Sequence, residues 1–231
     1  MLMKWHFEDF IYGSFDGSVT TFAVVAGAIG ASLSPEIVLI LGFANLGADG
    51  FSMAVGNYQA TKARMEFVEK ERKREEWEVD NTAEAEKQEI RDIYAKKGFT
   101  AELLDEIVSV ITARKKVWVD TMMKEELGLI EDDRKPLDTA LSTIFGFIAI
   151  GLIPLIPFIV LHITGLATST SEGFTYSIVF TGGSFFLIGI IKGKIVKKPI
   201  LRSGLITLTI GAIAATVAYL VGNLLGSLVR I

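Results

Sequence analysis

Long apolar segments alternate with one highly charged stretch along this chain. Five segments are nearly free of charge, and each is long enough to cross a hydrocarbon layer about 30 Å thick. The charged residues concentrate between the second and third of these segments, where helix-forming residues predominate. We therefore predict an all-α integral membrane protein with five transmembrane helices and a helical domain between helices 2 and 3. The five segments cover residues 10–32, 36–58, 138–163, 173–191 and 200–228.

This pattern divides the chain into three parts. Residues 1–59 would contain transmembrane helices 1 and 2, residues 60–136 the polar helical domain, and residues 137–231 the last three transmembrane helices. Composition agrees with this division, because half of the 231 residues are hydrophobic and the mean hydropathy is +0.44. The formal net charge of −4 averages over two environments and adds little.

Turn signals divide the polar domain into four helices. The second transmembrane helix meets no Gly or Pro at the membrane surface, so it should continue into this domain. Asp80-Asn81-Thr82 is typical of a break followed by a new N-cap, Gly98 of a helix end, and Thr100 of another N-cap. The predicted helices extend to about residue 79, from there to about residue 97, and over residues 101–116 and 117–127.

Basic residues indicate the orientation. With five spans, Lys4, the 60–136 domain and the short basic loop at 192–202 fall on one side of the membrane. The opposite side holds a single basic residue, Arg230. Cytoplasmic loops carry the excess of Lys and Arg. We therefore predict that the N-terminus and the 60–136 domain are cytoplasmic and that the C-terminus is not.

Two carboxylates interrupt the first two apolar segments. Asp16 and Asp49 are costly in lipid, and such residues usually face a polar pathway or a partner. Asp16 could instead be a residue near a helix N-terminus, favoured by the helix dipole, and Asp49 a packing residue. Asn45 and Met53 share a helical face with Asp49. A face that combines amide, carboxylate and thioether groups is suited to a cation path.

Carboxylates also recur at helical spacing in the polar domain. Each of two Glu-x-x-Glu pairs shares a helical face, and a further glutamate follows two methionines by one turn. Converging glutamate oxygens and thioether sulfur suit a divalent first-row metal such as Fe²⁺. The alternatives are an ordinary solvated helix surface and methionines that fill core gaps. The candidate ligands are Glu75, Glu78, Glu86, Glu89, Met122, Met123 and Glu126.

Other chemistry finds little support. The chain has no cysteine, which excludes disulfides and thiolate metal sites. A di-iron oxidoreductase would usually recruit Glu-x-x-His pairs, and neither His6 nor His162 lies in the polar domain. We expect no enzyme activity, no prosthetic group and no nucleic-acid partner.

Four stretches of the chain resemble the vacuolar iron transporter family, which includes the yeast calcium-cross-complementer type. They are SFDGSVTTFAVVAGAIGA, ADGFSMAVGNYQATKA, VDTMMKEELGL and GLIPLIPF, and they are spread from the first span to the third. The resemblance implies a homodimer in the lipid bilayer that exchanges cytoplasmic Fe²⁺, and often Mn²⁺, for protons. It also implies that the seven candidate ligands collect metal, and that Asp16 and Met53 lie on the translocation path.

One departure from the family pattern concerns the path. Iron-specific plant members carry a glutamate where this chain has Asn45 and a small residue where it has Asp49, so Asp49 could replace the missing carboxylate. We predict a divalent-metal exporter with proton antiport, in the cell membrane of a prokaryote or the vacuolar membrane of a eukaryote. The alternative is a membrane-anchored metal sensor or buffer without transport.

Overall fold

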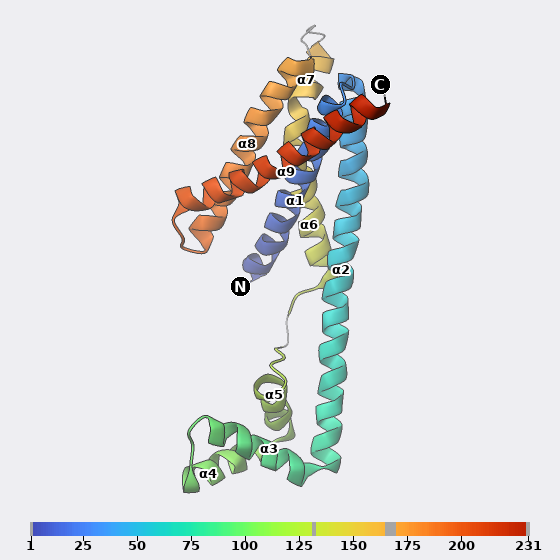
Figure 1. Ribbon diagram of the computed structural model, residues 1–231. Helices are drawn as coiled ribbons and strands as arrows, with labels where there is room; N and C mark the ends of the chain where they lie inside the picture. Colours follow the sequence, from blue (N-terminus) through green and yellow to red (C-terminus); the bar gives the residue numbers. More distant parts are fainter. Residues whose placement is uncertain (1, 131–132, 165–169, 230–231) are drawn as a thin grey trace. The chain divides into compact units, whose positions relative to one another are not determined.

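The computed structural model describes residues 2–130, 133–164 and 170–229, and these residues form helices joined by short connections, without a strand (Figure 1). The chain divides into two compact units. Residues 1–59 and 135–231 form one, called the membrane unit here, and residues 60–134 form the other, called the charged unit. Each unit has its own cluster of buried apolar side chains. Arg230, used above to predict orientation, lies outside the described residues.

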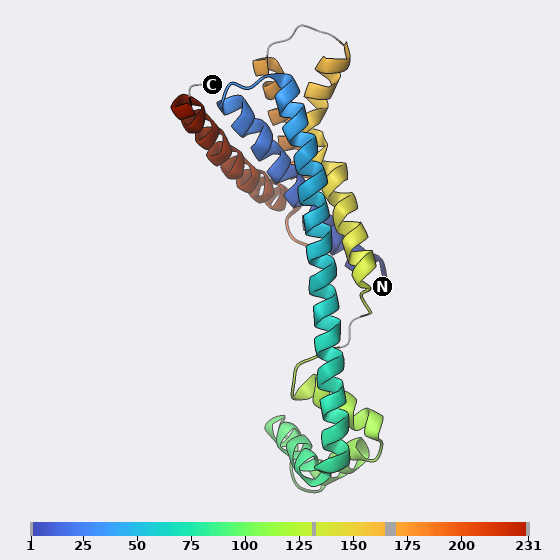
Figure 2. The ribbon, with the colours of Figure 1, turned by 90° about the vertical axis from the view of Figure 1, so that its right-hand side faces the viewer.

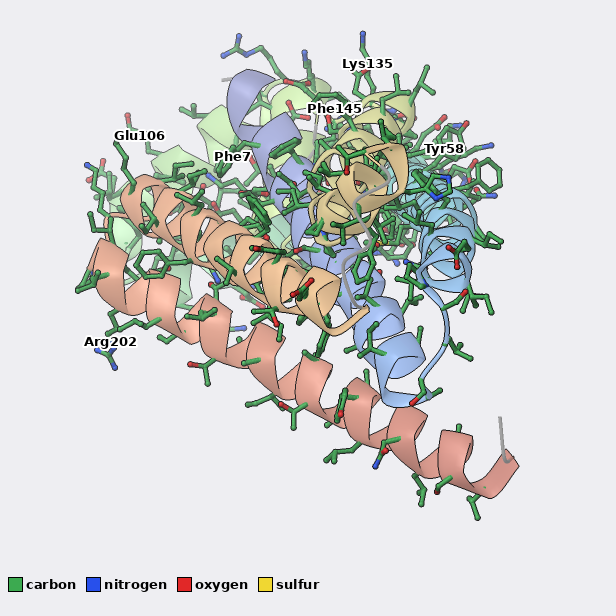
Figure 3. The ribbon with its side chains drawn as sticks, turned by 90° about the horizontal axis from the view of Figure 1, so that it is seen from above. Phe7, Tyr58, Glu106, Lys135, Phe145 and Arg202 are labelled. Atoms are coloured by element: carbon green, nitrogen blue, oxygen red, sulfur yellow. The ribbon has the colours of Figure 1, made fainter. Side chains whose placement is uncertain are left out.

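The membrane unit is built from the long apolar helices. Helix α1 packs along α6, α8 and α9, and α8 and α9 form an antiparallel pair (Figures 1 and 3). Arg202, at the start of α9, points away from both helices of this pair (Figure 3). The elements are α1 (Leu2–Gly30), α2 (Pro35–Asn81), α6 (Pro136–Gly151), η1 (Ile153–Leu155), α7 (Ile156–Thr164), α8 (Thr170–Ile195) and α9 (Ile200–Val229).

Among the described residues, four helical segments are long and apolar enough to cross a membrane. Helix α1 forms where a span is expected, but it is not one of the four, because Asp16 and several Ser and Thr residues interrupt its apolar sequence. The multi-span character is therefore confirmed, and a span by α1 stays a prediction. The four segments are Pro35–Asn81, Pro136–Thr164, Glu172–Ile195 and Ile200–Leu228.

Glycines allow helices of the membrane unit to approach closely. A Cβ at Gly13 would lie 2.0 Å from the Thr143 carbonyl oxygen, and one at Gly17 would lie 2.4 Å from the Phe147 carbonyl oxygen. A side chain at either position would force α1 and α6 apart. Two further Gly-xxx-Gly pairs also lie at close contacts: Gly189 and Gly193 on α8 approach the start of α9, and Gly222 and Gly226 on α9 approach the end of α1.

Two prolines, Pro154 and Pro157, interrupt the third apolar segment. The 3₁₀ turn η1, which contains Pro154, separates α6 from α7. Proline removes a backbone donor, so a nearby carbonyl needs another partner. The Ser177 hydroxyl on α8 donates to the Pro154 carbonyl oxygen at 2.8 Å, in a buried position. A side chain of the same protein thus supplies a hydrogen bond to a carbonyl at the helix break.

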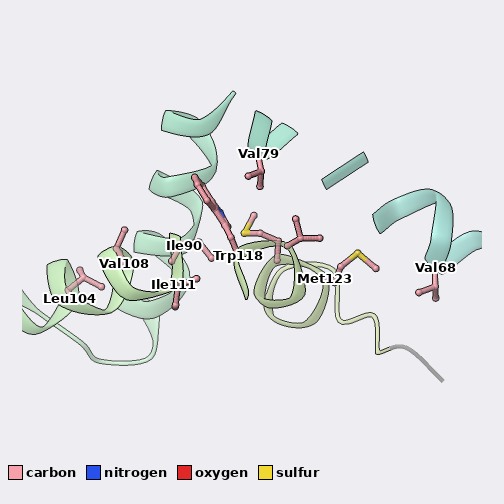
Figure 4. Close-up of a cluster of buried hydrophobic side chains, with 10 residues drawn as sticks. Val68, Val79, Ile90, Leu104, Val108, Ile111, Trp118 and Met123 are labelled. Carbon is pink, nitrogen blue, oxygen red and sulfur yellow. The ribbon is translucent and has the colours of Figure 1, made fainter. Parts of the chain in front are cut away.

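The charged unit is a small helical domain. Helix α2 continues into it without a break (Figure 2), and α3 (Ala83–Lys96), α4 (Ala101–Thr112) and α5 (Lys115–Glu125) follow. Their apolar faces meet around Trp118, Ile90 and the two methionines of α5 (Figure 4). Gly98, with φ +97°, follows α3. Its backbone conformation is one that few other residues adopt.

The structure corrects two local predictions. The third helix was expected to reach residue 116, but α4 ends at Thr112 and Arg114 is extended, which lets α5 turn back onto α4. Thr82 and Thr100 occupy N-cap positions, but neither side chain makes the capping hydrogen bond. The Thr82 hydroxyl instead donates to the Glu78 carbonyl oxygen at 2.8 Å, and so stabilises the end of α2.

Candidate metal centre

Three carboxylates converge within the charged unit. Glu75 and Glu78 lie one helical turn apart on α2, and Glu86 lies one turn into α3. The tight connection between α2 and α3 brings Glu86 back toward the end of α2. One carboxylate oxygen from each residue lies within 4.8 Å of the other two. Three of the candidate ligands predicted from helical spacing are therefore close enough to share one cation.

Two of these carboxylates are buried with unpaired oxygens. Glu75 is fully buried and Glu86 is 5 % exposed. The Oε2 atoms of both residues lack a hydrogen-bond partner. A buried carboxylate without a partner is costly unless it binds a cation or takes up a proton. This observation distinguishes the cluster from the solvated acidic surface that the sequence left open as an alternative.

Burial and mutual repulsion raise the pKa of two carboxyls at this centre, those of Glu86 and Glu126. Burial, followed by the charges of Glu89 and Glu75, raises the pKa of Glu86 to about 7. Partial burial, followed by Glu75 and Glu89, raises the pKa of Glu126 to about 7 as well. Glu89 and Glu126 are more exposed than the other three but act on the same centre. The charges of all five predicted glutamates thus interact, and near neutral pH protons and cations compete for Glu86 and Glu126.

The two candidate methionines lie in the core of the charged unit. Met122 is fully buried and Met123 is 2 % exposed, and both belong to the apolar cluster around Trp118 (Figure 4). The Met122 carbonyl oxygen accepts the Glu126 backbone N–H, which fixes this glutamate one turn beyond. Core packing is therefore an observed role of these methionines, and ligation by sulfur stays a prediction.

Sequence reasoning missed one cation at this centre, Arg74. Its guanidinium lies 3.0 Å from Glu75, 2.9 Å from Glu71 and 3.5 Å from Glu78. Glu71 was not a candidate either, although only 7 % of it is exposed. The spacing i, i+3 and i+4 along α2 could have indicated the pairs of Arg74 with Glu71 and Glu78, but the alternating charges around them resemble an ordinary helix surface.

In the membrane unit, the predicted path residues of α2 face α1. The Asn45 amide nitrogen donates to the hydroxyls of Thr20 and Thr21 at 3.3 Å each. The carboxylates of Asp16 and Asp49 lie close enough to repel each other. Asn45, Asp49 and Met53 are each half-buried, and Met53 packs on the membrane unit's apolar cluster. A polar contact between α1 and α2 therefore contains the two aspartates of the predicted path, Asp16 and Asp49.

A second polar contact joins three helices of the membrane unit and was not predicted. The Asn57 amide nitrogen on α2 donates to Asp9 Oδ1 on α1 at 2.9 Å and to Thr143 Oγ1 on α6 at 2.7 Å. Asp9 is 5 % exposed and Thr143 is fully buried. Sequence alone did not indicate which helices are neighbours, so it could not pair these residues.

Comparison with known proteins now identifies the chain. The model of the VIT family matches residues 7–223. The chain belongs to the VIT family. A protein of Toxoplasma gondii named "Vacuolar iron transporter" is 40% identical over 219 residues, which cover 93% of this chain and 72% of that protein. "Vacuolar iron transporter 1" of Arabidopsis thaliana is 33% identical over 213 residues, covering 92% of this chain and 83% of that protein.

Membership of the VIT family confirms the resemblance inferred from the four sequence stretches. A third relative, named "Vacuolar iron transporter" in Plasmodium berghei, is 34% identical over 229 residues, covering 97% of this chain and 84% of its own length. The VIT-family match extends over both units, so the carboxylate centre and the polar contacts of α1 all lie within the matched residues.

Proposed function

We propose that this VIT-family protein carries Fe²⁺ out of the cytosol, and that the charged unit collects the ion. The observation that carries the proposal is the convergence of Glu75, Glu78 and Glu86, with buried carboxylate oxygens that lack partners. Helices long enough to span a membrane belong to the same chain. Relatives named for iron transport support the choice of metal.

The ligand chemistry favours a divalent ion of intermediate softness. Glutamate oxygens alone suit Mg²⁺, Ca²⁺ or Mn²⁺, and a thioether from Met122 or Met123 shifts the preference toward Fe²⁺. Fe²⁺ is therefore the proposed substrate, and Mn²⁺ a second one. Glu89 and Glu126 complete the collecting centre, because their charges act on the buried carboxyls.

Transport then follows the polar contact between α1 and α2, past Met53, Asp49 and Asp16. A carboxylate holds either a proton or a cation well, so one displaces the other. This exclusion is the physical basis proposed for proton antiport. Helix α1 acts as the fifth span, a second copy of the chain completes a homodimer, and the N-terminus and charged unit face the cytoplasm. The membrane is vacuolar in a eukaryote and the cell membrane in a prokaryote.

A flux assay in sealed proteoliposomes tests the proposal. Fe²⁺, Mn²⁺, Co²⁺, Zn²⁺ and Ca²⁺ are supplied one at a time, with and without a pH gradient. We expect Fe²⁺ flux that the gradient accelerates, and loss of this acceleration in Asp16→Asn. Asp138→Asn, at the start of α6, is the control for the removal of one aspartate charge. Gradient-driven flux that is equal in Asp16→Asn and wild type would contradict proton coupling at Asp16.

The same assay distinguishes transport from a metal sensor or buffer. A sensor would bind Fe²⁺ in the charged unit but leave the vesicle interior free of metal. Binding without flux, in vesicles shown to be sealed and to contain folded protein, would therefore replace the transport proposal with the sensor alternative.

A further inference from the structure

Arg74 makes the densest set of ion pairs in the described part of the charged unit. Its Nη1 lies 2.9 Å from Glu71 Oε2, its Nη2 lies 3.0 Å from Glu75 Oε1, and its Nε lies 3.5 Å from Glu78 Oε2. Two of these three carboxylates, those of Glu75 and Glu78, belong to the convergent cluster. The guanidinium therefore contacts two groups that the proposed function assigns to the metal.

Burial differs among the four side chains in a way that matters for metal entry. The Arg74 side chain is 46% exposed and that of Glu78 is 30% exposed, whereas those of Glu71 and Glu75 are 9% and 1% exposed. Arg74 can therefore move toward solvent, but Glu71 and Glu75 cannot. Glu71 also lies 3.3 Å from Lys70, which is itself exposed. Glu71 thus offers Arg74 a fixed contact that is not part of the convergent cluster.

A divalent ion and this guanidinium cannot both bind the cluster well. The three cluster carboxylates repel one another, and the charge of Arg74 offsets part of the repulsion that acts on Glu75. A metal ion in the cluster would repel the guanidinium a few ångströms away. Arg74 contacts two of the three cluster carboxylates, those of Glu75 and Glu78. Metal binding would therefore weaken the contacts of Arg74 with Glu75 and Glu78, whereas its contact with Glu71 could remain.

We propose that Arg74 is a built-in competitor, which occupies the carboxylate cluster when metal is absent and weakens metal binding when metal is present. This inference rests on the proposed function of the charged unit. A collecting site that feeds a transport path must also release its ion. A tethered cation promotes release, because it takes back Glu75 and Glu78 as the metal leaves. Arg74 is thus a residue that tunes affinity, and Glu71 positions it.

Two substitutions with opposite expected effects test the inference. Anaerobic calorimetric titration of Fe²⁺ into the full-length protein in detergent gives the dissociation constant. Arg74→Gln removes the competitor, so Fe²⁺ should bind roughly fivefold more tightly. The expected change is this small because solvent screens the charge of the half-exposed Arg74 side chain. Glu71→Gln weakens the alternative contact of Arg74, so Fe²⁺ should bind several-fold more weakly. Arg74→Lys keeps the positive charge but loses the planar guanidinium. Its Fe²⁺ affinity should lie between those of the wild type and Arg74→Gln.

The neighbouring pair Glu69–Lys73 provides matched controls. Its side chains are exposed, 2.6 Å apart, and do not contact the cluster. Lys73→Gln changes the net charge as Arg74→Gln does, and Glu69→Gln matches Glu71→Gln. Both controls should bind Fe²⁺ as the wild type does. Melting temperatures without metal identify any variant that is destabilised.

The outcomes separate this inference from the proposed function. Tighter binding by Arg74→Gln and weaker binding by Glu71→Gln, with unchanged controls, would support competition. If both variants bind more weakly, Arg74 only organises the site and the inference is wrong. The inference is also wrong if Arg74→Gln and Lys73→Gln bind Fe²⁺ with the same affinity. In either of these cases the proposed function remains supported if the wild type binds Fe²⁺ and the Glu75→Gln variant does not. Absence of Fe²⁺ binding by the wild type would overturn both.

Discussion

The two units treat buried polar groups differently. In the membrane unit, buried polar side chains mainly pair with one another or with the backbone, as in the Asn57 contact with Asp9 and Thr143 and the 3.1 Å contact between the Ser18 and Ser184 hydroxyls. In the charged unit, buried carboxylates gather with like charges and leave oxygens unpaired. Paired groups hold helices together, whereas unpaired like charges mark a place for a cation.

The largest effect is expected where this pairing is broken in the membrane unit. Asn57→Leu removes the donor to Asp9 and Thr143 and leaves a buried carboxylate and a buried hydroxyl with fewer partners. We expect a loss of about 2–3 kcal/mol of stability. Thermal unfolding in detergent would measure it. Asn223→Leu is the control, because Asn223 is exposed on α9. Equal melting temperatures of Asn57→Leu and Asn223→Leu would show that the Asn57 contact contributes little to stability.

The opposite change is expected at the carboxylate cluster. Glu75→Gln removes a buried charge that repels its neighbours, so the metal-free protein should lose no stability. Fe²⁺ binding should weaken at least about tenfold, because Glu75 is a proposed metal ligand and even the loss of an outer-shell partner typically costs roughly 10–100-fold in affinity. Calorimetric titration measures the binding. The exposed neighbour Glu76 provides the control Glu76→Gln, which should bind as the wild type does. Equal binding by both variants would remove Glu75 from the site.

Some features of the fold and the site could be predicted from the sequence, and others could not. Hydropathy, Asp80-Asn81-Thr82 and Gly98 predicted most of the helices and the breaks after α2 and α3, since these signals are local. Helical spacing placed Glu75 with Glu78. The pairing of Asn57 with Asp9 and the convergence of Glu86 on α2 depend on which helices become neighbours. The end of α4 at Thr112 was missed because the following residues favour a helix, and packing of α5 overrides that preference.

The stability of the charged unit should also depend on pH near neutrality. Glu86 and Glu126 have pKa values raised to about 7, so in the metal-free protein they stabilise the fold when protonated. That contribution is complete below the ordinary glutamate pKa of 4.5 and is lost as pH rises through about 7. We expect about 1 kcal/mol per carboxyl after solvent screening.

Fe²⁺ binding should follow the reverse trend and strengthen from pH 6 to pH 8, because protons leave the ligands. Denaturant unfolding at several pH values measures the first effect, and anaerobic titration the second. The double variant Glu86→Gln, Glu126→Gln should flatten both profiles. Unchanged profiles in this variant would show that other groups titrate.

The smallest expected effect concerns the methionines. Met122→Leu keeps the volume of a fully buried side chain and should cost less than about 1 kcal/mol of stability. If sulfur also ligates the metal, Fe²⁺ binding should weaken while Mg²⁺ or Ca²⁺ binding does not change. Val119→Leu, at another buried position of α5, is a packing control without sulfur. Equal Fe²⁺ affinity in Met122→Leu and wild type would leave Met122 a core residue only.

Fe²⁺ flux into sealed proteoliposomes, measured against Fe²⁺ concentration for wild type and Glu75→Gln, tests the central claim most directly. A centre that collects metal for transport should act where the ion is scarce. Glu75→Gln should therefore raise the Fe²⁺ concentration needed for half-maximal flux roughly tenfold or more and leave the maximal rate nearly unchanged. Superimposed curves for Glu75→Gln, Glu76→Gln and wild type would show that the carboxylate cluster does not serve transport.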